Sequence, residues 1–166
     1  MLLKSSKTQW VFWLSIFAGI LLALVATPEY LRIMKPFWMA LIMAYWILEV
    51  PEYVPLGRVA IIGFFMDLVN GVLLGEYAIR LIIIAFIITR IRSRMRFFPL
   101  PQQALVIFAL LLNDRIVQLM IKSFTGVAWP PWTFWIAPIS GMLIWPWLFL
   151  IMDFCTRQLN LKESTT

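Results

Sequence analysis

The sequence predicts an all-α integral membrane protein, a bundle of six transmembrane helices in one domain that covers residues 1–166. Of the 166 residues, 63% are hydrophobic and only 13% are charged, whereas a soluble domain has about 45–50% apolar and about 25% charged residues. A folded domain of about 150 residues still exposes about 30% of its chain surface, so the medium around these side chains must be lipid. Six spans of about 20 residues each would use most of the chain and leave no room for a separate soluble domain.

Six apolar runs define the predicted spans, and polar or proline-containing segments separate them. The first run follows two lysines, Lys4 and Lys7. A signal peptide is the alternative interpretation, because its apolar part also follows basic residues. The run is longer than the roughly 7–15 residues of such a segment, and Leu24-Val25-Ala26 is a poor cleavage site, so we expect a retained helix. The six predicted spans are 10–26, 37–50, 58–74, 77–91, 103–121 and 132–152.

Prolines set the limits of the second span and shape the last. Pro36 precedes the run 37–50 and Pro51 ends it, because proline suits a first helical turn and the residue before proline leaves the helical region. This run is short for a span, so it either lies nearly upright with snorkelling flanks or is partly re-entrant. Pro138 and Pro146 predict that the last helix is kinked or broken.

Turn residues separate the middle spans. Pro55 and Gly57 mark the turn before the third span, and Gly75-Glu76 make a tight connection to the fourth. With six spans, about nine lysines and arginines lie on the side of both termini and about three on the other side. Because positive charge accumulates on the cytoplasmic side, we predict that both termini are cytoplasmic.

The composition excludes several kinds of chemistry. The chain has no histidine and one cysteine, Cys155, so imidazole catalysis, histidine ligation of metals and an intrachain disulfide are absent. No phosphate-binding glycine motif occurs. The net charge of +6 fits membrane topology and anionic phospholipid, and not nucleic acid. We therefore expect no enzyme activity, no cofactor and no metal.

Two ionisable residues lie inside predicted spans at similar depth. Asp67 is about nine residues into the third span and Arg115 about twelve into the fifth, and both spans run outward. Charged groups in hydrocarbon are costly and normally face protein or water. We expect Asp67 and Arg115 to pair, or to share a polar cluster with Asn70, Asn113 and Asp114. The pair would be a structural lock between helices; a proton or ion relay is the alternative.

Small residues mark one face of the third span. Gly63, Asp67, Gly71 and Gly75 recur every four residues and so lie on one helix face. Small residues on a face let another helix approach closely. That helix could belong to this chain or to a partner, and we name these residues, with Asn70, as candidates for either contact.

Two further segments are notable. The fourth span ends in Arg90, Arg92, Arg94 and Arg96, which predict a solvated cap that anchors anionic headgroups or docks a cytoplasmic protein. In the last span, the proline of Trp145-Pro146-Trp147 should free a backbone carbonyl and bend the helix. Trp145 and Pro146 are therefore also contact candidates.

Several segments together resemble the MreD family of rod shape-determining proteins, of the gammaproteobacterial type. They are Pro36-Phe37-Trp38, Tyr45-Trp46-Ile47-Leu48, the stretch from Gly63 to Gly75, Gln102-Gln103-Ala104-Leu105-Val106, and Leu143 to Leu150 with its Trp145-Pro146-Trp147. The resemblance covers nearly the whole chain, and its specificity lies in the order of the segments.

The resemblance implies a non-enzymatic inner-membrane component of the elongasome. Such a protein would bind MreC through transmembrane helices and help control lateral peptidoglycan synthesis by RodA and its partner transpeptidase. Contacts with those proteins and with MreB would be indirect. The family is also similar in fold to the substrate-binding subunits of energy-coupling-factor transporters, so a small-molecule-binding transporter subunit is the alternative function. An enzyme acting on lipid-linked precursors is a more distant one.

Overall fold

The computed structural model describes residues 6–25, 34–124, 126 and 130–161, and these residues form helices without any strand. This confirms the all-α prediction. Each of the six apolar runs contributes one helix, and two short 3-10 turns, η1 and η2, lie between helices. The elements are α1 Ser6–Leu24, α3 Trp38–Glu49, η1 Pro51–Tyr53, α4 Leu56–Asn70, α5 Glu76–Met95, α6 Leu100–Phe124, η2 Trp132–Trp135 and α7 Ile136–Leu161. Lys4, Ala26, Arg32 and Lys162, which entered the span and topology predictions, lie outside the described residues.

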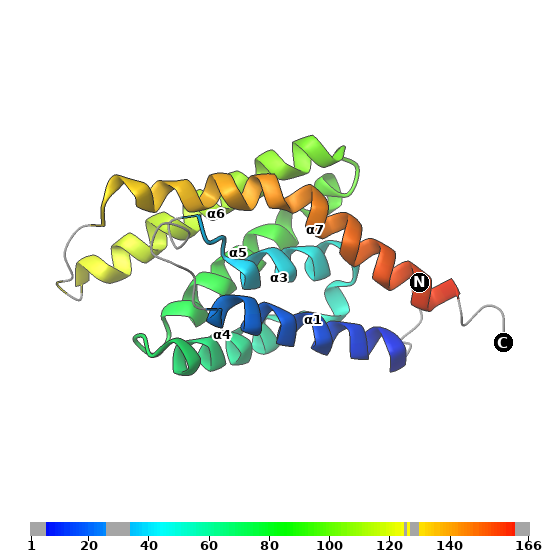
Figure 1. Ribbon diagram of the computed structural model, residues 1–166, viewed down its shortest axis with the longest axis horizontal. Helices are drawn as coiled ribbons and strands as arrows, with labels where there is room; N and C mark the ends of the chain where they lie inside the picture. Colours follow the sequence, from blue (N-terminus) through cyan, green and yellow to red (C-terminus); the bar gives the residue numbers. More distant parts are fainter. Residues whose placement is uncertain (1–5, 26–33, 125, 127–129, 162–166) are drawn as a thin grey trace.

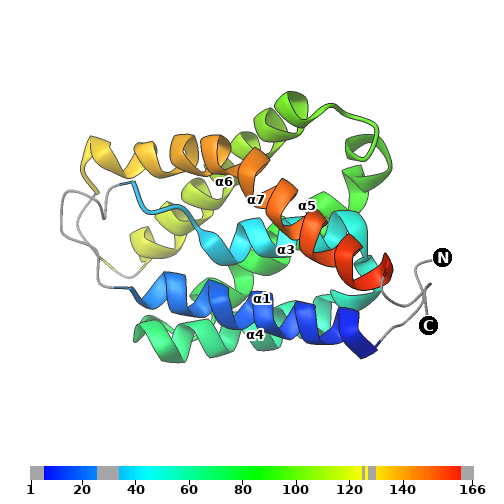
Figure 2. The ribbon, with the colours of Figure 1, turned by 45° about the vertical axis from the view of Figure 1, so that its right-hand side comes forward.

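The long helices lie roughly side by side, and the chain reverses direction from one helix to the next (Figure 1). The start of α1 and the end of α7 consequently lie at the same end of the bundle in both ribbon views (Figure 2). The closest packing joins α4 to α5 and α6 to α7.

Helix α3 is the core of the bundle. It packs against α1, α5 and α7, and every residue from Met39 to Leu48 is buried. Its 12 residues rise only about 18 Å, whereas the hydrocarbon core is about 30 Å thick. The predicted run 37–50, which is short for a span, therefore forms a helix that is surrounded by other helices of its own chain.

The outer surface of the bundle is strongly apolar. Large hydrophobic side chains are exposed on α1, α4, α5, α6 and α7, among them Trp13, Phe64, Phe86, Leu105 and Trp147. Soluble proteins rarely expose contiguous apolar surface on this scale. Two helical segments, Leu100–Phe124 and Trp132–Gln158, are long and apolar enough to cross a membrane.

The ends of α4 and α5 differ from the predicted runs, and Pro146 does not interrupt α7. Helix α4 ends at Asn70, before the predicted limit of 74, because Gly71 adopts the left-handed conformation (φ 62°) that terminates helices. Helix α5 continues to Met95, since arginine is a good helix former and no proline occurs before Pro99. Helix α7 is unbroken at Pro146, and it changes direction near its middle (Figure 1).

Candidate functional site

Asp67 is a clamp between α4 and α5. It is fully buried, and both carboxylate oxygens accept hydrogen bonds from backbone amides at the start of α5. The Gly75 amide donates to Oδ2 at 2.8 Å and the Tyr77 amide donates to Oδ1 at 2.7 Å. The first amides of a helix lack partners within it, and a negative charge there is favoured by the helix dipole. Asp67 thus caps a helix that begins nine residues further along the chain.

The glycines of this segment serve the same α4–α5 corner. A Cβ atom at Gly63 would lie 2.3 Å from the Cα atom of Ala78 on α5, so the two backbones touch here. Gly75 adopts φ 101° directly before α5, a conformation that is strained for other residues. Asn70 donates its side-chain amide to the Met66 carbonyl at 2.8 Å within α4. At Gly63 and Asp67 the small-residue face of the third span therefore packs against α5 of this chain, whereas a Cβ atom added at Gly71 would meet nothing within 4 Å.

Replacing Asp67 by Ala is expected to destabilise the fold by about 2 kcal/mol, the upper range for losing an N-cap, because two buried amides lose their acceptors. The midpoint of thermal unfolding, followed by circular dichroism in detergent, measures the change. Asn70→Ala is the matched control, since it removes one hydrogen bond from a half-buried side chain. Equal destabilisation by both variants would contradict the clamp.

Arg80 and Asp114 form the principal buried ion pair among the described residues. Arg80 Nε donates to Asp114 Oδ1 at 2.8 Å and Nη2 donates to Oδ2 at 2.6 Å. The side chains are 3% and 1% exposed. The guanidinium carbon also lies 4.6 Å from the ring centroid of Phe37 and 5.1 Å from that of Tyr77. This paired geometry joins α5 to α6 and compensates both charges.

The ion pair extends into a polar network that we define as Glu76, Arg80, Asp114, Arg115 and Gln118. Arg80 Nη1 lies 3.6 Å from Glu76 Oε1, and Gln118 Nε2 donates to that oxygen at 3.3 Å. Arg115 Nη1 in turn donates to Gln118 Oε1 at 2.9 Å. Two acids and two arginines balance, so the polar network adds no net charge to the interior.

The predicted pairing of Asp67 with Arg115 is corrected by this geometry. The Asp67 oxygens are used by backbone amides, whereas Arg115 binds Gln118 and lies 4.5 Å from the ring centroid of Phe134. Asp114, predicted only as a cluster member, is the residue that binds an arginine, and Arg80 was not among the candidates. The signal for Arg80 was its spacing of four residues from Glu76, which places the two on one helix face.

Trp145 is a core residue. It is fully buried and its ring centroid lies 5.8 Å from that of Phe149. Within the described part of the chain, its indole N–H has no acceptor. Pro146, beside it, is half-buried within α7. Trp145 therefore shapes the contact of α7 with the bundle and is inaccessible to a partner, while Trp147 faces outward with 72% of its surface exposed.

The four arginines at the end of α5 are not equivalent. Arg90, Arg94 and Arg96 are exposed, and Arg92 is half-buried. Arg92 Nε donates to the Leu48 carbonyl at 2.9 Å, which places a cation on the last turn of α3. Cations are favoured at helix C-termini. Three arginines are thus available to headgroups or to another protein, and the fourth holds the central helix.

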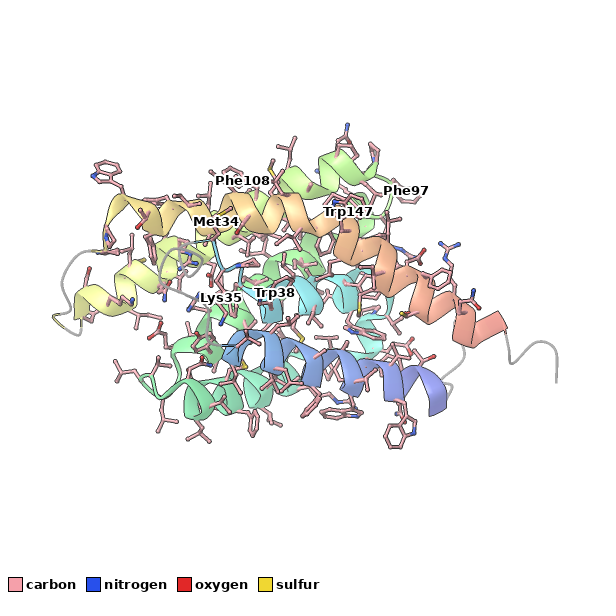
Figure 3. The ribbon with its side chains drawn as sticks, in the orientation of Figure 1. Met34, Lys35, Trp38, Phe97, Phe108 and Trp147 are labelled. Carbon is pink, nitrogen blue, oxygen red and sulfur yellow. The ribbon has the colours of Figure 1, made fainter. Side chains whose placement is uncertain are left out.

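Two other cations bind the ends of helical elements in the same way. Lys35 donates to the carbonyls of Ala23 and Val25 at the end of α1, and Figure 3 shows Lys35 beside that end. Arg58 Nη1 donates to the carbonyl of Tyr53, the last residue of η1, at 3.0 Å. Burial, and secondarily Glu52, raises the pKa of the Tyr53 phenol, so this ring stays neutral at physiological pH.

The part of the chain that the structure describes holds no candidate metal site, and two of its grooves are apolar. No cluster of three or more His, Cys, Asp or Glu side chains that could hold a metal occurs there. An apolar groove of about 720 Å³ lies between α1 and α4, and a smaller one of about 350 Å³ lies near Lys35. Neither groove is lined by Asp67 or by a member of the polar network.

Comparison with known proteins assigns the chain to a family. The family model described as "rod shape-determining protein MreD" matches residues 4–155. The "Rod shape-determining protein MreD" of Haemophilus influenzae is 29% identical over 154 residues, which are 92% of this chain and 95% of that relative. No solved structure matches the chain. The family match extends from before α1 into the last turns of α7; the chain therefore belongs to the MreD family of rod shape-determining proteins, whose role is in cell shape and not in enzymatic catalysis.

Proposed function

We propose that this chain is a multi-pass component of the bacterial inner membrane that binds MreC within the elongasome. Through MreC it helps control rod shape and lateral peptidoglycan synthesis by RodA and its partner transpeptidase, and its contacts with these enzymes and with MreB are indirect. The chain passes through the membrane six times, with the short α3 enclosed by the other helices, and both termini are cytoplasmic. Membership in the MreD family and the apolar outer surface of the bundle support this proposal.

The outward face of α7 is the surface that we propose for the contact with MreC. Leu143, Trp147, Leu150 and Phe154 are each more than half exposed, and their spacing of four, three and four residues makes one stripe along the helix. Apolar residues at this spacing form the seam at which two helices pack side by side. We therefore place the contact with the transmembrane helix of MreC on this stripe, on the face of α7 opposite to the buried Trp145.

We propose that this chain acts by binding a partner and not by catalysing a reaction. A binding partner shifts a conformational equilibrium only by its preference for one of the states. The chain would bind MreC more tightly in the conformation that activates the synthase. The buried ion pair and the Asp67 clamp would keep the bundle rigid, so that the stripe on α7 presents a constant surface.

Co-purification tests this function. The full chain, extracted in mild detergent, is expected to capture MreC in stoichiometric amounts. Replacing Trp147 and Phe154 together by Ala should reduce the affinity for MreC roughly 30-fold, which corresponds to an interface hot spot of about 2 kcal/mol. Phe86→Ala is the matched control, because Phe86 is an aromatic residue exposed on α5 and lies on another helix.

Two outcomes would contradict the proposal. The first is a failure of the unchanged chain to capture MreC. The second is saturable binding of a water-soluble small molecule by the isolated chain without MreC, which would favour the transporter alternative and its likeness to the energy-coupling-factor subunits. Among the described residues, the buried charges bind one another and do not line the two apolar grooves, which counts against that alternative.

A further inference from the structure

The groove between α1 and α4 has the same geometry on both sides. The two helices start at the same end of the bundle and lie next to each other (Figures 1 and 2). On each helix the lining residues have the spacing of one helix face, with gaps of three, one and three residues. They are Trp13, Ile16, Phe17 and Ile20 on α1, and Arg58, Ile61, Ile62 and Phe65 on α4. The result is an apolar fissure of about 720 Å³ that opens on the outer surface.

One end of this fissure is cationic. Arg58 is the only charged residue of the lining and, with Trp13, is the first lining residue on its helix. Its Nη1 donates to the Tyr53 carbonyl, and it takes part in none of the ion pairs among the described residues. Arg58 is exposed, and a guanidinium has five N–H donors in a planar fork that matches a phosphate. The fissure therefore has an unmatched positive charge at one end and apolar walls beyond it.

This pattern is complementary to an amphiphile. A partner's transmembrane helix is apolar along its length and would leave Arg58 without a counter-charge. A phospholipid has an anionic phosphate above an acyl chain and matches both parts. With cytoplasmic termini as proposed above, Arg58 lies at the start of an outward-running helix and so near the inner headgroups, while the fissure extends toward the hydrocarbon. Trp13 at this end has the amphipathic ring that is enriched at this depth.

We infer that the α1–α4 fissure is a phospholipid site of the inner leaflet, in which Arg58 binds the phosphate and the apolar residues enclose an acyl chain. This site is separate from the α7 stripe and from the arginines at the end of α5. The inference rests on the membrane embedding of the proposed function but not on the binding of MreC.

Photolabelling of the full chain tests the site. The probe is phosphatidylglycerol with a diazirine on its acyl chain, in vesicles of phosphatidylethanolamine and phosphatidylglycerol, and adducts are mapped by mass spectrometry. Adducts are expected to concentrate on the lining residues of α1 and α4. Arg58→Gln should reduce them about fivefold, as expected for the loss of about 1 kcal/mol of headgroup attraction by one basic residue, whereas Arg58→Lys should retain most of them.

Matched controls separate the site from general lipid contact. Arg94→Gln removes an exposed arginine outside the lining and should leave the adducts unchanged. Ile61→Trp fills the fissure and should abolish them with Arg58 intact. A diazirine diacylglycerol, which lacks the phosphate, should label the wild-type chain and the Arg58→Gln variant equally weakly. Circular dichroism shows whether each variant is folded.

Three results would overturn the inference. They are equal labelling of the wild-type chain and the Arg58→Gln variant, an equal loss of adducts in the Arg94→Gln variant, and crosslinking of the lining residues to a partner's helix with no lipid adduct. Capture of MreC is measured separately, so a failure of the lipid site with intact capture counts against this inference alone.

Discussion

Replacing Asp114 by Ala is expected to destabilise the fold by about 3–5 kcal/mol, the cost of leaving one member of a buried ion pair without its partner. Arg80 would retain its charge in a site where its side chain is 3% exposed, and its nearest remaining acid, Glu76, is 3.6 Å away and shared with Gln118. The unfolding midpoint in detergent and the amount of protein in the membrane measure this loss.

The chain offers a matched control for this prediction. Asp153 forms an ion pair with Arg157 at 2.9 Å, but Arg157 is 76% exposed, and pairs of this kind contribute about 0–1 kcal/mol. Asp153→Ala should therefore change the midpoint little. Replacing Arg80 and Asp114 together by Met and Leu should recover much of the lost stability, because apolar residues of similar volume can replace a buried pair. If the double variant is no more stable than Asp114→Ala, the uncompensated charge is not the cause.

Gly63→Ala is expected to cost about 3 kcal/mol, the upper part of the usual range for overpacking. The added Cβ atom would lie 2.3 Å from the Cα and 2.8 Å from the amide nitrogen of Ala78. These are backbone atoms, so no rotamer change can relieve the contact and α4 must move away from α5. The unfolding midpoint and the accessibility of Ala78→Cys to a thiol reagent would both report this separation.

Gly57→Ala is the control for this substitution. Gly57 also lies in α4, but apart from the adjoining residues and backbone of its own helix nothing lies within 4 Å of the position that an added Cβ atom would take. Alanine is favoured over glycine in a helix by about 1 kcal/mol, so this variant should be neutral or slightly more stable. Destabilisation of both variants to the same extent would show that the close contact with Ala78 is unimportant.

The sequence predicted the helices well because apolar runs and prolines are local signals. The position of α3 at the centre was not predicted, since α3 is apolar on all of its faces, and such a helix can be surrounded either by protein or by lipid. Spacing placed Gly63 and Asp67 on one face, but spacing alone does not identify the helix that this face meets. That helix is the next in the chain, α5.

The ion pair was missed for a related reason. Arg80 and Asp114 are 34 residues apart on different helices, and estimates of depth have an error of about one helical turn of 5.4 Å. Similar depth in the membrane was therefore enough to predict, wrongly, that Asp67 and Arg115 form a pair. The backbone amides at the start of α5 are the true partners of the Asp67 carboxylate, and backbone amides carry no side-chain signal by which a sequence could reveal them.

The burial of α3 has a consequence for the biogenesis of this protein. A helix of 12 residues is too short to be held across a bilayer by its own hydrophobicity, and only α1 among its neighbours is synthesised before it, whereas α5 and α7 follow later. The Tyr45 hydroxyl, for example, donates to Thr156 Oγ1 at 3.2 Å, across 111 residues of sequence. While the ribosome is still translating α6, α3 has only part of its final enclosure. We therefore expect α3 to reach its final enclosure only after α7 has been synthesised.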